Sequence, residues 1–468
     1  MTDQPGWNTP VNRREFVGYA GALMALGMTD FPGNAMAATS TQPAKIKISR
    51  VAANFDREVL NPYRFKGNAI TESWQTVARI DTESGSSGVG LCTQGVLWSD
   101  FRVFEAHSES AANALMYAMS EHALQLLRGT TFTNPVDLLD RLLPEVLAYG
   151  KKITGIPDLR KTFALNALVG VDNAAWLAYA QENKIRSFDD LIPAAYRPAL
   201  SARHPKVASI PSFSVGLGAD TVKAAADAGS FVLKLKTGSA GTQAEMIEKD
   251  IAFLTAVHRV VGHYETPYTQ SGKIRYLVDP NGRYEKKETL LRFLDHAKKI
   301  GAFDQIAAIE EPFAETNEAA VGDLGVRIAA DESAHTVEDA ARRIEQGYGA
   351  IVLKGIAKTL SMTMKIAQLA FEKATPCFCA DLTVNPILVD WNKCVAARLS
   401  PYPGMTVGLL ETNGHQYYKA WDKLMTYHPK AGAIWTQTRK GVYETDDSFF
   451  RESGGIFEPS AHYSGLVS

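Results

Sequence analysis

Short apolar runs recur through the second half of the chain, separated mostly by stretches with a helical pattern. The runs lie at 207–212, 231–235, 274–278, 305–309, 326–330, 350–353, 376–380 and 405–409. Between most of them, apolar residues return every three or four positions, as in 242–261 and 285–300, which predicts amphipathic helices. Strands that alternate with helices in this way are typical of a (β/α)8-type barrel, which we expect over 205–418.

The first half follows a different pattern. Apolar and polar residues alternate over 45–51 and again over 73–80, which predicts two half-buried strands. Between them, 56–69 is rich in polar and charged residues and is expected to form a loop. The glycine-rich stretch 83–90 is expected to be the turn into a third strand.

Long helical patterns follow these strands, from about 109 to 180. A sheet followed by helices is an α+β arrangement, so we expect a separate α+β domain over 45–200. The last segment, 419–468, is rich in aromatic residues and glycine and matches no barrel unit. We expect this segment to fold back and complete the first domain.

Residues 1–37 are predicted to be an export signal rather than part of the fold. Arg13 and Arg14 precede a modest apolar run, 18–28, and a small-residue cleavage site of the Ala-x-Ala type ends at Ala37. Paired arginines followed by phenylalanine resemble the twin-arginine export signal, which implies a periplasmic protein. The apolar run is too short to span a bilayer, so no stable membrane anchor is expected.

The composition excludes several classes of protein. With 468 residues, 46% of them apolar and 21% charged, the chain has the make-up of an ordinary globular protein. Its formal net charge of −2 gives no reason to expect a nucleic-acid partner. The histidines and the four cysteines show none of the spacings typical of zinc sites, and the cysteines are expected to be free thiols. The sequence is compatible with a homo-oligomer.

Two lysines stand on one face of a predicted apolar strand. Lys234 and Lys236 are two positions apart in the run that begins at Phe231, so their side chains project to the same side. Burying an ammonium group costs free energy unless an opposite charge compensates it. Two neighbouring ammonium groups also lower each other's pKa, and a lysine in that situation can act as a base. A solvent-exposed strand face is the alternative interpretation, and the residues at the other strand ends argue against it.

Carboxylates stand at the ends of the following strands. Asp279, Glu310 and Asp331 end three successive predicted strands, and Lys354 ends the strand after them. In a barrel of this kind the active site lies at the carboxyl ends of the strands. Three carboxylates with open positions suit a hard cation such as Mg²⁺. Each acid alone would also fit a helix N-cap, but three in register with lysines on either side favour a metal site.

These motifs resemble those of the enolase superfamily and, within it, the branch of muconate-lactonizing enzymes and dipeptide epimerases. The family pattern is Lys-x-Lys, Asp-x-Asn, Glu-x-Pro, Asp-Glu-Ser and then a lysine on the sixth strand. This chain carries it in the same order, at Lys234 to Lys236, Asp279 to Asn281, Glu310 to Pro312, Asp331 to Ser333 and Lys354. The resemblance covers roughly the chain from Lys45 to the C-terminus. It implies an α/β fold, a modified TIM barrel of the (β/α)7β type with an α+β capping domain.

The resemblance also implies a metal site. Asp279, Glu310 and Asp331 match the ligands of one essential Mg²⁺ ion. The family pattern favours Glu310 over the adjacent Glu311. Glu332 is expected to support the lysines electrostatically rather than bind the metal.

A proton α to a carboxylate is too weakly acidic for a neutral base alone, and Mg²⁺ on the carboxylate oxygens would stabilise the enolate. Lys236 is expected to remove the proton, tuned by Lys234, which also contacts the substrate carboxylate. Lys354 comes from the opposite side of the barrel, so proton return to the other face gives racemisation or epimerisation. The same lysines also allow a cycloisomerase, or a syn-dehydratase similar to o-succinylbenzoate synthase. A non-catalytic binding protein on the same barrel is the third alternative.

The partner is expected to be a small-molecule carboxylate, such as a dipeptide or an N-acyl amino acid. In dipeptide epimerases an acidic Asp-x-Asp motif on the eighth strand holds the substrate ammonium, and this chain has Glu411 and Asn413 there. Asn281 completes the Asp-x-Asn motif of the third strand. Arg64 and Lys66, in the expected loop 56–69, are candidates to close over the barrel mouth and bind an acidic group.

Overall fold

The structure is a computed structural model that describes residues 45–65 and 68–468. The export signal predicted for 1–37 and the candidate Lys66 lie outside the described residues. Within the described part of the chain, no helix is both long enough and apolar enough to cross a membrane. The four cysteines are all buried and unbridged.

An antiparallel sheet of four strands, in the order β3-β2-β1-β4, begins the described chain. Its strands are β1 (Ile46–Phe65), β2 (Asn68–Thr82), β3 (Ser87–Thr93) and β4 (Thr131–Phe132). The loop predicted over 56–69 is wrong, because β1 and β2 continue there as a long hairpin. Phe55 stacks on Trp74 with ring centroids 4.2 Å apart, and Arg57 pairs with Glu72 across the strands. Such cross-strand pairs stabilise a polar hairpin that lacks the apolar alternation on which the prediction relied.

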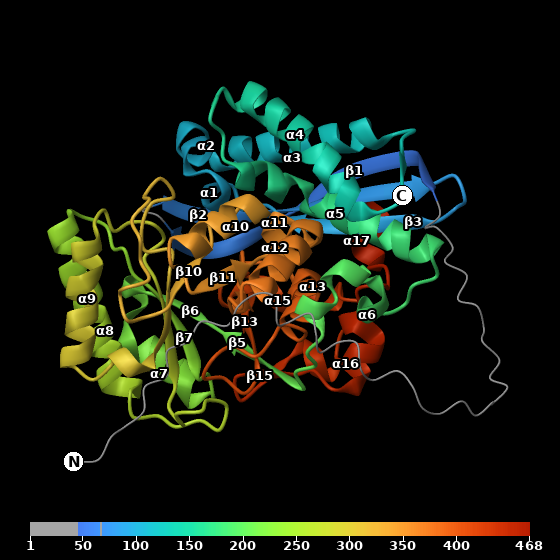
Figure 1. Cartoon of the computed structure of the whole chain (residues 1–468). Helices are drawn as coiled ribbons and strands as arrows, with labels where there is room; N and C mark the ends of the chain where they lie inside the picture. Colours follow the sequence, from blue (N-terminus) through green and yellow to red (C-terminus); the bar gives the residue numbers. More distant parts are fainter. Residues whose placement is uncertain (1–44, 66–67) are drawn as a thin grey trace, which may run out of the picture. The chain divides into compact units, whose positions relative to one another are not determined.

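Helices follow this sheet along the chain. They are α1 (Val96–Ser99), α2 (Phe101–Ala106), α3 (Glu109–Leu127), α4 (Pro135–Thr154), α5 (Lys161–Glu182) and α6 (Phe188–Leu191). α3 and α5 pack against the sheet, whereas α6 contacts Arg398 and Ser453. Gly88 and Gly90 let α5 approach β3 closely, since a Cβ at either would lie 2.0 Å from a carbonyl oxygen, of Ala174 and Gly170 respectively. Gly88 and Gly90 of the predicted turn therefore serve helix packing, whereas Gly85, with a φ of 93°, lies in the turn itself. Figure 1 shows α3, α4 and α5 gathered with β1 to β3.

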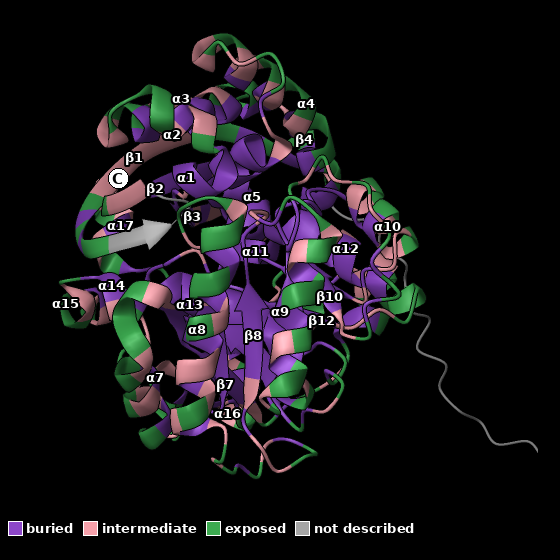
Figure 2. Ribbon diagram, turned by 90° about the vertical axis from the view of Figure 1, so that its left-hand side faces the viewer, coloured by how far each residue is buried: buried purple, intermediate pink, exposed green. Residues whose placement is uncertain are grey.

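Parallel strands form the second, larger sheet. They are β5 (Lys206–Ile210), β6 (Ser212–Ser214), β7 (Val232–Lys236), β8 (Arg275–Asp279), β9 (Ile306–Glu310), β10 (Ile328–Ala330), β11 (Ala350–Leu353), β12 (Cys377–Cys379) and β13 (Gly408–Glu411). β5 pairs with β13 and β6 pairs with β7, and only Pro211 separates β5 from β6. The two ends of the run of strands therefore meet, and the sheet curls as a barrel does. Figure 2 shows β7 and β8 buried within it.

Helices follow most of these strands. They are α7 (Gly218–Asp227), α8 (Gln243–Val261), α9 (Lys287–Lys299), α10 (Val337–Glu345), α11 (Gly355–Lys358), α12 (Leu360–Glu372) and α13 (Pro386–Ala396). α8 begins with a capping box, in which the Thr242 hydroxyl accepts the Glu245 amide and the Glu245 carboxylate accepts the Thr242 amide. The connection from β9 to β10 is a loop, and its first residues follow Glu310 at the barrel mouth.

The C-terminal segment contacts both the cap and the barrel. Its elements are α14 (Gly414–Tyr417), α15 (Trp421–Thr426), β14 (Thr438–Arg439), β15 (Val442–Glu444), α16 (Asp447–Glu452) and α17 (Ala461–Leu466). β15 pairs antiparallel with β5 and so extends the barrel sheet. Further on, the Leu466 carbonyl accepts a hydrogen bond from Asn54 at 2.8 Å, and His462 lies 2.8 Å from Asp56. The segment is therefore shared between the two sheets.

Buried polar contacts also join the cap to the barrel. Asp172 of α5 accepts hydrogen bonds from the Ser361 amide at 3.0 Å and from the Ser361 hydroxyl at 2.5 Å. The Trp176 indole donates to the same hydroxyl at 2.9 Å. Burial raises the pKa of Asp172 to about 7, against the hydrogen bonds from Ser361, which lower it. These contacts hold α5 against the start of α12.

Candidate active site

A cavity between the cap hairpin and the barrel contains the predicted lysines. Its barrel side is lined by Lys234, Lys236, Lys354, Asp381, Leu382, Thr383, Glu411 and Asn413. Its cap side is lined by Leu60, Ile70, Glu72, Ser73, Gln94, Gly95 and Trp98. The volume is about 60 Å³, which is room for a few water molecules. Because β8, β9 and β10 stand between β7 and β11, the lysines reach the cavity from opposite sides of the barrel.

Lys234 is buried and bound by three carboxylates. Its Nζ lies 2.8 Å from Glu310, 2.9 Å from Glu411 and 3.1 Å from Asp279. Burial by itself lowers the pKa of Lys234, but the three acids outweigh burial and hold this pKa well above its usual value. Lys234 is therefore a fixed cation that links β7 to β8, β9 and β13.

Lys236 is the more accessible lysine of the pair. Its side chain is 15% exposed, compared with 1% for Lys234. Its Nζ lies 2.5 Å from Oδ2 of Asp279. Burial raises the pKa of Asp279, but Lys236 and Lys234 together outweigh burial and lower this pKa to about 2. Asp279 is therefore ionised and holds both lysines.

Lys354 reaches the cavity from the other side. Its Nζ lies 2.5 Å from Oδ2 of Asp331 and 4.5 Å from the centre of the Trp98 ring, a distance typical of a cation–π contact. The Trp98 indole nitrogen donates to the same Asp331 oxygen at 3.4 Å. Asp331 and Trp98 together fix the position of the Lys354 ammonium group.

A second lysine, Lys358, also binds Asp331. Its Nζ donates to the Asp331 carbonyl at 2.5 Å and lies 3.3 Å from Oδ1. Burial lowers the pKa of both lysines. At Lys354 the charge of Asp331 outweighs burial, so the pKa of Lys354 is raised. At Lys358 burial outweighs Asp331, so the pKa of Lys358 is lowered. Burial raises the pKa of Asp331 as well, and the two lysines outweigh burial and hold this pKa far below its usual value. Asp331 is therefore ionised.

Two adjacent glutamates at the end of β9 make different contacts. Glu310 binds Lys234 inside the barrel. Glu311 has a φ of 39°, a strained value for a residue other than glycine, and accepts the amides of Asp331 and Ser333 at 2.7 and 3.2 Å. Burial, followed by the charge of Glu332, raises the pKa of Glu311 to about 7. Glu310 and Asp279 therefore both contact Lys234, whereas Glu311 stabilises the loop after β10 through hydrogen bonds to its backbone.

The remaining predicted residues have supporting positions or lack a described side chain. Nδ2 of Asn281 lies 3.5 Å from Glu332, and the Asn281 amide donates to Asp279 at 2.9 Å. Glu332 is among the acids that raise the pKa of Lys354. Neither Asn281 nor Glu332 lines the cavity. The backbone of Arg64 pairs with Ala69 near the end of the cap hairpin, and its side chain lies outside the described part of the structure.

The donor chemistry of Asp279, Glu310 and Asp331 suits a hard divalent cation. Oε2 of Glu310 is buried and has no hydrogen-bond partner among the described residues. Burial and the charge of Asp279 raise the pKa of Glu310 well above its usual value, an effect that a nearby cation would oppose. The acids are nevertheless paired with lysines, and over 45–65 and 68–468 no three histidine, cysteine, aspartate or glutamate side chains form a group that could hold a metal ion. Metal binding therefore requires the ammonium groups to move away from these oxygens.

Three residues at the site were not among the residues predicted for it. Lys358 lies four positions after Lys354, and this helical spacing is a signal that could have identified it. Asp381 ends the seventh strand as the other acids end theirs; burial raises its pKa to about 6, and it accepts the Asn413 amide at 2.7 Å. The contact of Trp98 depends on how the cap meets the barrel, and no local pattern indicates it.

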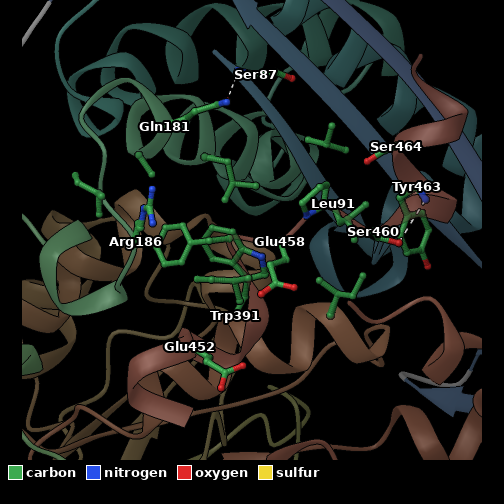
Figure 3. Close-up of a pocket in the computed structure, with 18 of the residues that line it drawn as sticks. Ser87, Leu91, Gln181, Arg186, Trp391, Glu452, Glu458, Ser460, Tyr463 and Ser464 are labelled. Carbon is green, nitrogen blue, oxygen red and sulfur yellow. Dashed lines mark hydrogen bonds between the residues drawn. The ribbon is translucent and has the colours of Figure 1, made fainter. Parts of the chain in front are cut away.

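A larger cavity lies between the cap sheet and the C-terminal segment. Its volume is about 760 Å³, and it shares no lining residue with the cavity of the lysines. Figure 3 shows Gln181 and Arg186 from the cap and Trp391 and Glu458 from the rest of the chain around it. None of the predicted site residues lines this cavity, so size alone does not identify the active site.

Comparison with known proteins gives a family-model match over part of the barrel. Residues 218–401 match the family model described as Enolase C-terminal domain-like. No curated protein sequence matches the chain. Several solved structures share the fold over most of its length.

A dipeptide epimerase from Enterococcus faecalis V583, complexed with Mg and the dipeptide L-Leu-L-Tyr, has a TM-score of 0.60 and 17% identity, covering 85% of this chain and 97% of that chain. The L-Ala-D/L-Glu epimerase from Bacillus subtilis has a TM-score of 0.59 and 17% identity, covering 80% of this chain and 91% of that chain. A mandelate racemase/muconate lactonizing protein from Herpetosiphon aurantiacus has a TM-score of 0.60 and 16% identity, covering 86% of this chain and 96% of that chain. At these identities the likeness confirms the predicted fold, a small N-terminal sheet domain with a curled parallel sheet, and function has to be argued from the site.

Proposed function

Because the chain has the fold of the enolase superfamily, with an enolase C-terminal-like domain at 218–401, we propose that it is a racemase or epimerase that removes the proton α to a carboxylate. The observation that carries this proposal is that Lys236 and Lys354 line one cavity from opposite sides of the barrel. Two amines on opposite faces of one carbon allow proton removal from one face and proton return to the other. The epimerases of the same fold support this class of reaction.

Mg²⁺ is the proposed cofactor, and Asp279, Glu310 and Asp331 would hold it. Bound there, the ion would stabilise the negative charge that develops on the substrate carboxylate as the proton leaves. The oxygen-only donor set and the buried Glu310 oxygen without a hydrogen-bond partner among the described residues support this assignment.

The two lysines would carry the proton. With one stereoisomer, Nζ of Lys236, as the neutral amine, takes the α proton, and the electron pair of the broken C–H bond moves into the enolate of the substrate. Lys354, as an ammonium group, then donates a proton to the opposite face of the same carbon. With the other stereoisomer the two lysines exchange roles. To reach the carbon, Lys236 leaves Asp279 and Lys354 leaves Asp331, each 2.5 Å away in this structure.

Other residues would position these groups. Trp98 holds Lys354 by its ring face, and this contact keeps the ammonium group on the cavity side of β11. Lys234 compensates the charges of Glu310 and Glu411 beneath the reacting carbon. The apolar side chains of the cap would exclude water from the enolate.

The test is incubation of N-acyl amino acids and dipeptides in ²H₂O with Mg²⁺, followed by NMR and mass spectrometry. We expect deuterium at the α carbon of both stereoisomers. An unsaturated or cyclised product would instead identify a syn-dehydratase or a cycloisomerase on the same lysines. If none of the compounds undergoes exchange or gives a product, the proposal is contradicted.

A further inference from the structure

Three carboxylates line the active-site cavity, and two of them come from the barrel. Glu411 lies 2.9 Å from Lys234 and accepts the Asp381 amide at 3.3 Å. Asp381 accepts the Leu382 amide on one oxygen and the Asn413 amide on the other, both at 2.7 Å. Groups of the protein therefore already serve as ion-pair or hydrogen-bond partners of both carboxylates.

The third carboxylate, Glu72, belongs to the cap. It pairs with Arg57 and accepts hydrogen bonds from the Trp74 indole at 3.0 Å and from the Ser110 hydroxyl at 2.6 Å. Among the described lining residues, every carboxylate thus has a partner already, and the charges nearest to the reacting carbon are lysines. A substrate ammonium group would meet like charges and no available counter-ion.

Two uncharged acceptors belong to the lining of the same cavity. Oδ1 of Asn413 and Oε1 of Gln94 are buried and have no hydrogen-bond partner in the part of the chain that the structure describes. The Gln94 amide nitrogen donates to the Thr76 hydroxyl at 2.8 Å, which holds the side chain in this orientation. A buried acceptor without a donor is costly, so a ligand that brings an N–H group gains free energy here.

We propose that the substrate is an amino acid with an uncharged N-acyl group, and that the site disfavours compounds with a free ammonium group, such as ordinary dipeptides. The inference rests on the function proposed above. The amide N–H beside the reacting carbon donates to Asn413 or Gln94, and the acyl chain lies against Leu60, Ile70 and Leu382 once the cap side of this cavity of about 60 Å³ moves outward to admit it.

The test compares two matched series, L-alanyl-L-amino acids and N-propionyl-L-amino acids, which differ only by the ammonium group. With the Mg²⁺-loaded protein we expect kcat/KM for α-proton exchange to be about tenfold or more higher for the propionyl series, a change of about 1.4 kcal/mol. Calorimetric binding of the same compounds measures the preference independently of the chemical step, and we expect the propionyl series to bind more tightly.

A substitution provides the matched control. Asn413→Asp introduces a carboxylate into the cavity without a lysine partner and should shift the preference towards the alanyl series. Asn317→Asp adds the same charge at a half-buried residue outside the cavity and should leave the preference unchanged.

Equal or better exchange and binding of the alanyl series by the unmodified protein would overturn the substrate assignment and leave the proposed function intact. If neither series undergoes exchange, the proposed function itself fails, and the substrate assignment falls with it.

Discussion

Lys234 and Glu411 form a buried ion pair, with 2.9 Å between Nζ and Oε2, that joins the second strand of the barrel to the eighth. The same Nζ also contacts Glu310 and Asp279. A buried cation of this kind is needed to keep several acids ionised in one interior. Its removal takes this counter-charge from Glu310 and Glu411, whereas Asp279 keeps Lys236.

Lys234→Met should therefore destabilise the protein by about 3–5 kcal/mol, and adding Glu411→Gln should recover part of that loss. Urea unfolding measures both effects. Lys423→Met is the control, because its side chain is 60% exposed and its Nζ lies 3.7 Å from Glu58; we expect a change of about 1 kcal/mol or less. A loss at Lys234 no greater than at Lys423 would count against the structural role of the pair.

Trp98→Phe should slow α-proton exchange by about tenfold, since a desolvated cation–π contact contributes up to about 2 kcal/mol and phenylalanine keeps only part of it. The loss should be confined to the stereoisomer whose proton Lys354 handles, because Trp98 contacts that lysine. Trp391→Phe, in the larger cavity, should leave the rate unchanged. Equal losses for both stereoisomers would show that Trp98 acts on general stability instead.

Mg²⁺ should raise the thermal midpoint of the protein. A ligand that binds only the folded state stabilises it by about 2.7 kcal/mol at a hundredfold excess over Kd. Glu310→Gln should remove this effect, whereas Glu372→Gln, at an exposed residue, should keep it. Thermal unfolding after chelation and after return of the metal measures both variants. An undiminished Mg²⁺ effect in Glu310→Gln would refute the assignment of this glutamate as a ligand.

The buried Asp172 should make stability depend on pH. Its pKa in the folded protein is raised to about 7 by burial, above the ordinary 3.8, so the folded state binds the proton more tightly than the unfolded chain does. The resulting stability is fully present below about pH 4 and is lost as the pH rises to about 7, by roughly 4 kcal/mol.

Asp172→Asn isolates this contribution. Relative to the variant, the unmodified protein should lose stability between about pH 4 and pH 7 and stay level above that range. Urea unfolding at intervals of one pH unit measures the difference. A difference that is flat over this range, or that changes in favour of the unmodified protein, would mean that Asp172 is ionised in the folded state.

The barrel strands could be predicted because strands buried on both faces have continuous apolar runs and end in the same kinds of residue. The cap hairpin could not, because its stability comes from cross-strand contacts such as Phe55 with Trp74 rather than from alternation. At the site, the order of the motifs indicated which residues gather at the barrel mouth. Their partners, such as Lys358 at Asp331 and Trp98 at Lys354, depend on tertiary contacts that no spacing specifies.

The central claim is that Lys236 and Lys354 face opposite sides of one α carbon. The most direct measurement is deuterium exchange from each pure stereoisomer of a substrate in ²H₂O with Lys236→Ala and with Lys354→Ala. Each variant should still exchange the α proton of one stereoisomer, a different one in each case, and neither should interconvert the two. Loss of exchange from the same stereoisomer in both variants, or unchanged interconversion in either, would contradict the two-lysine assignment.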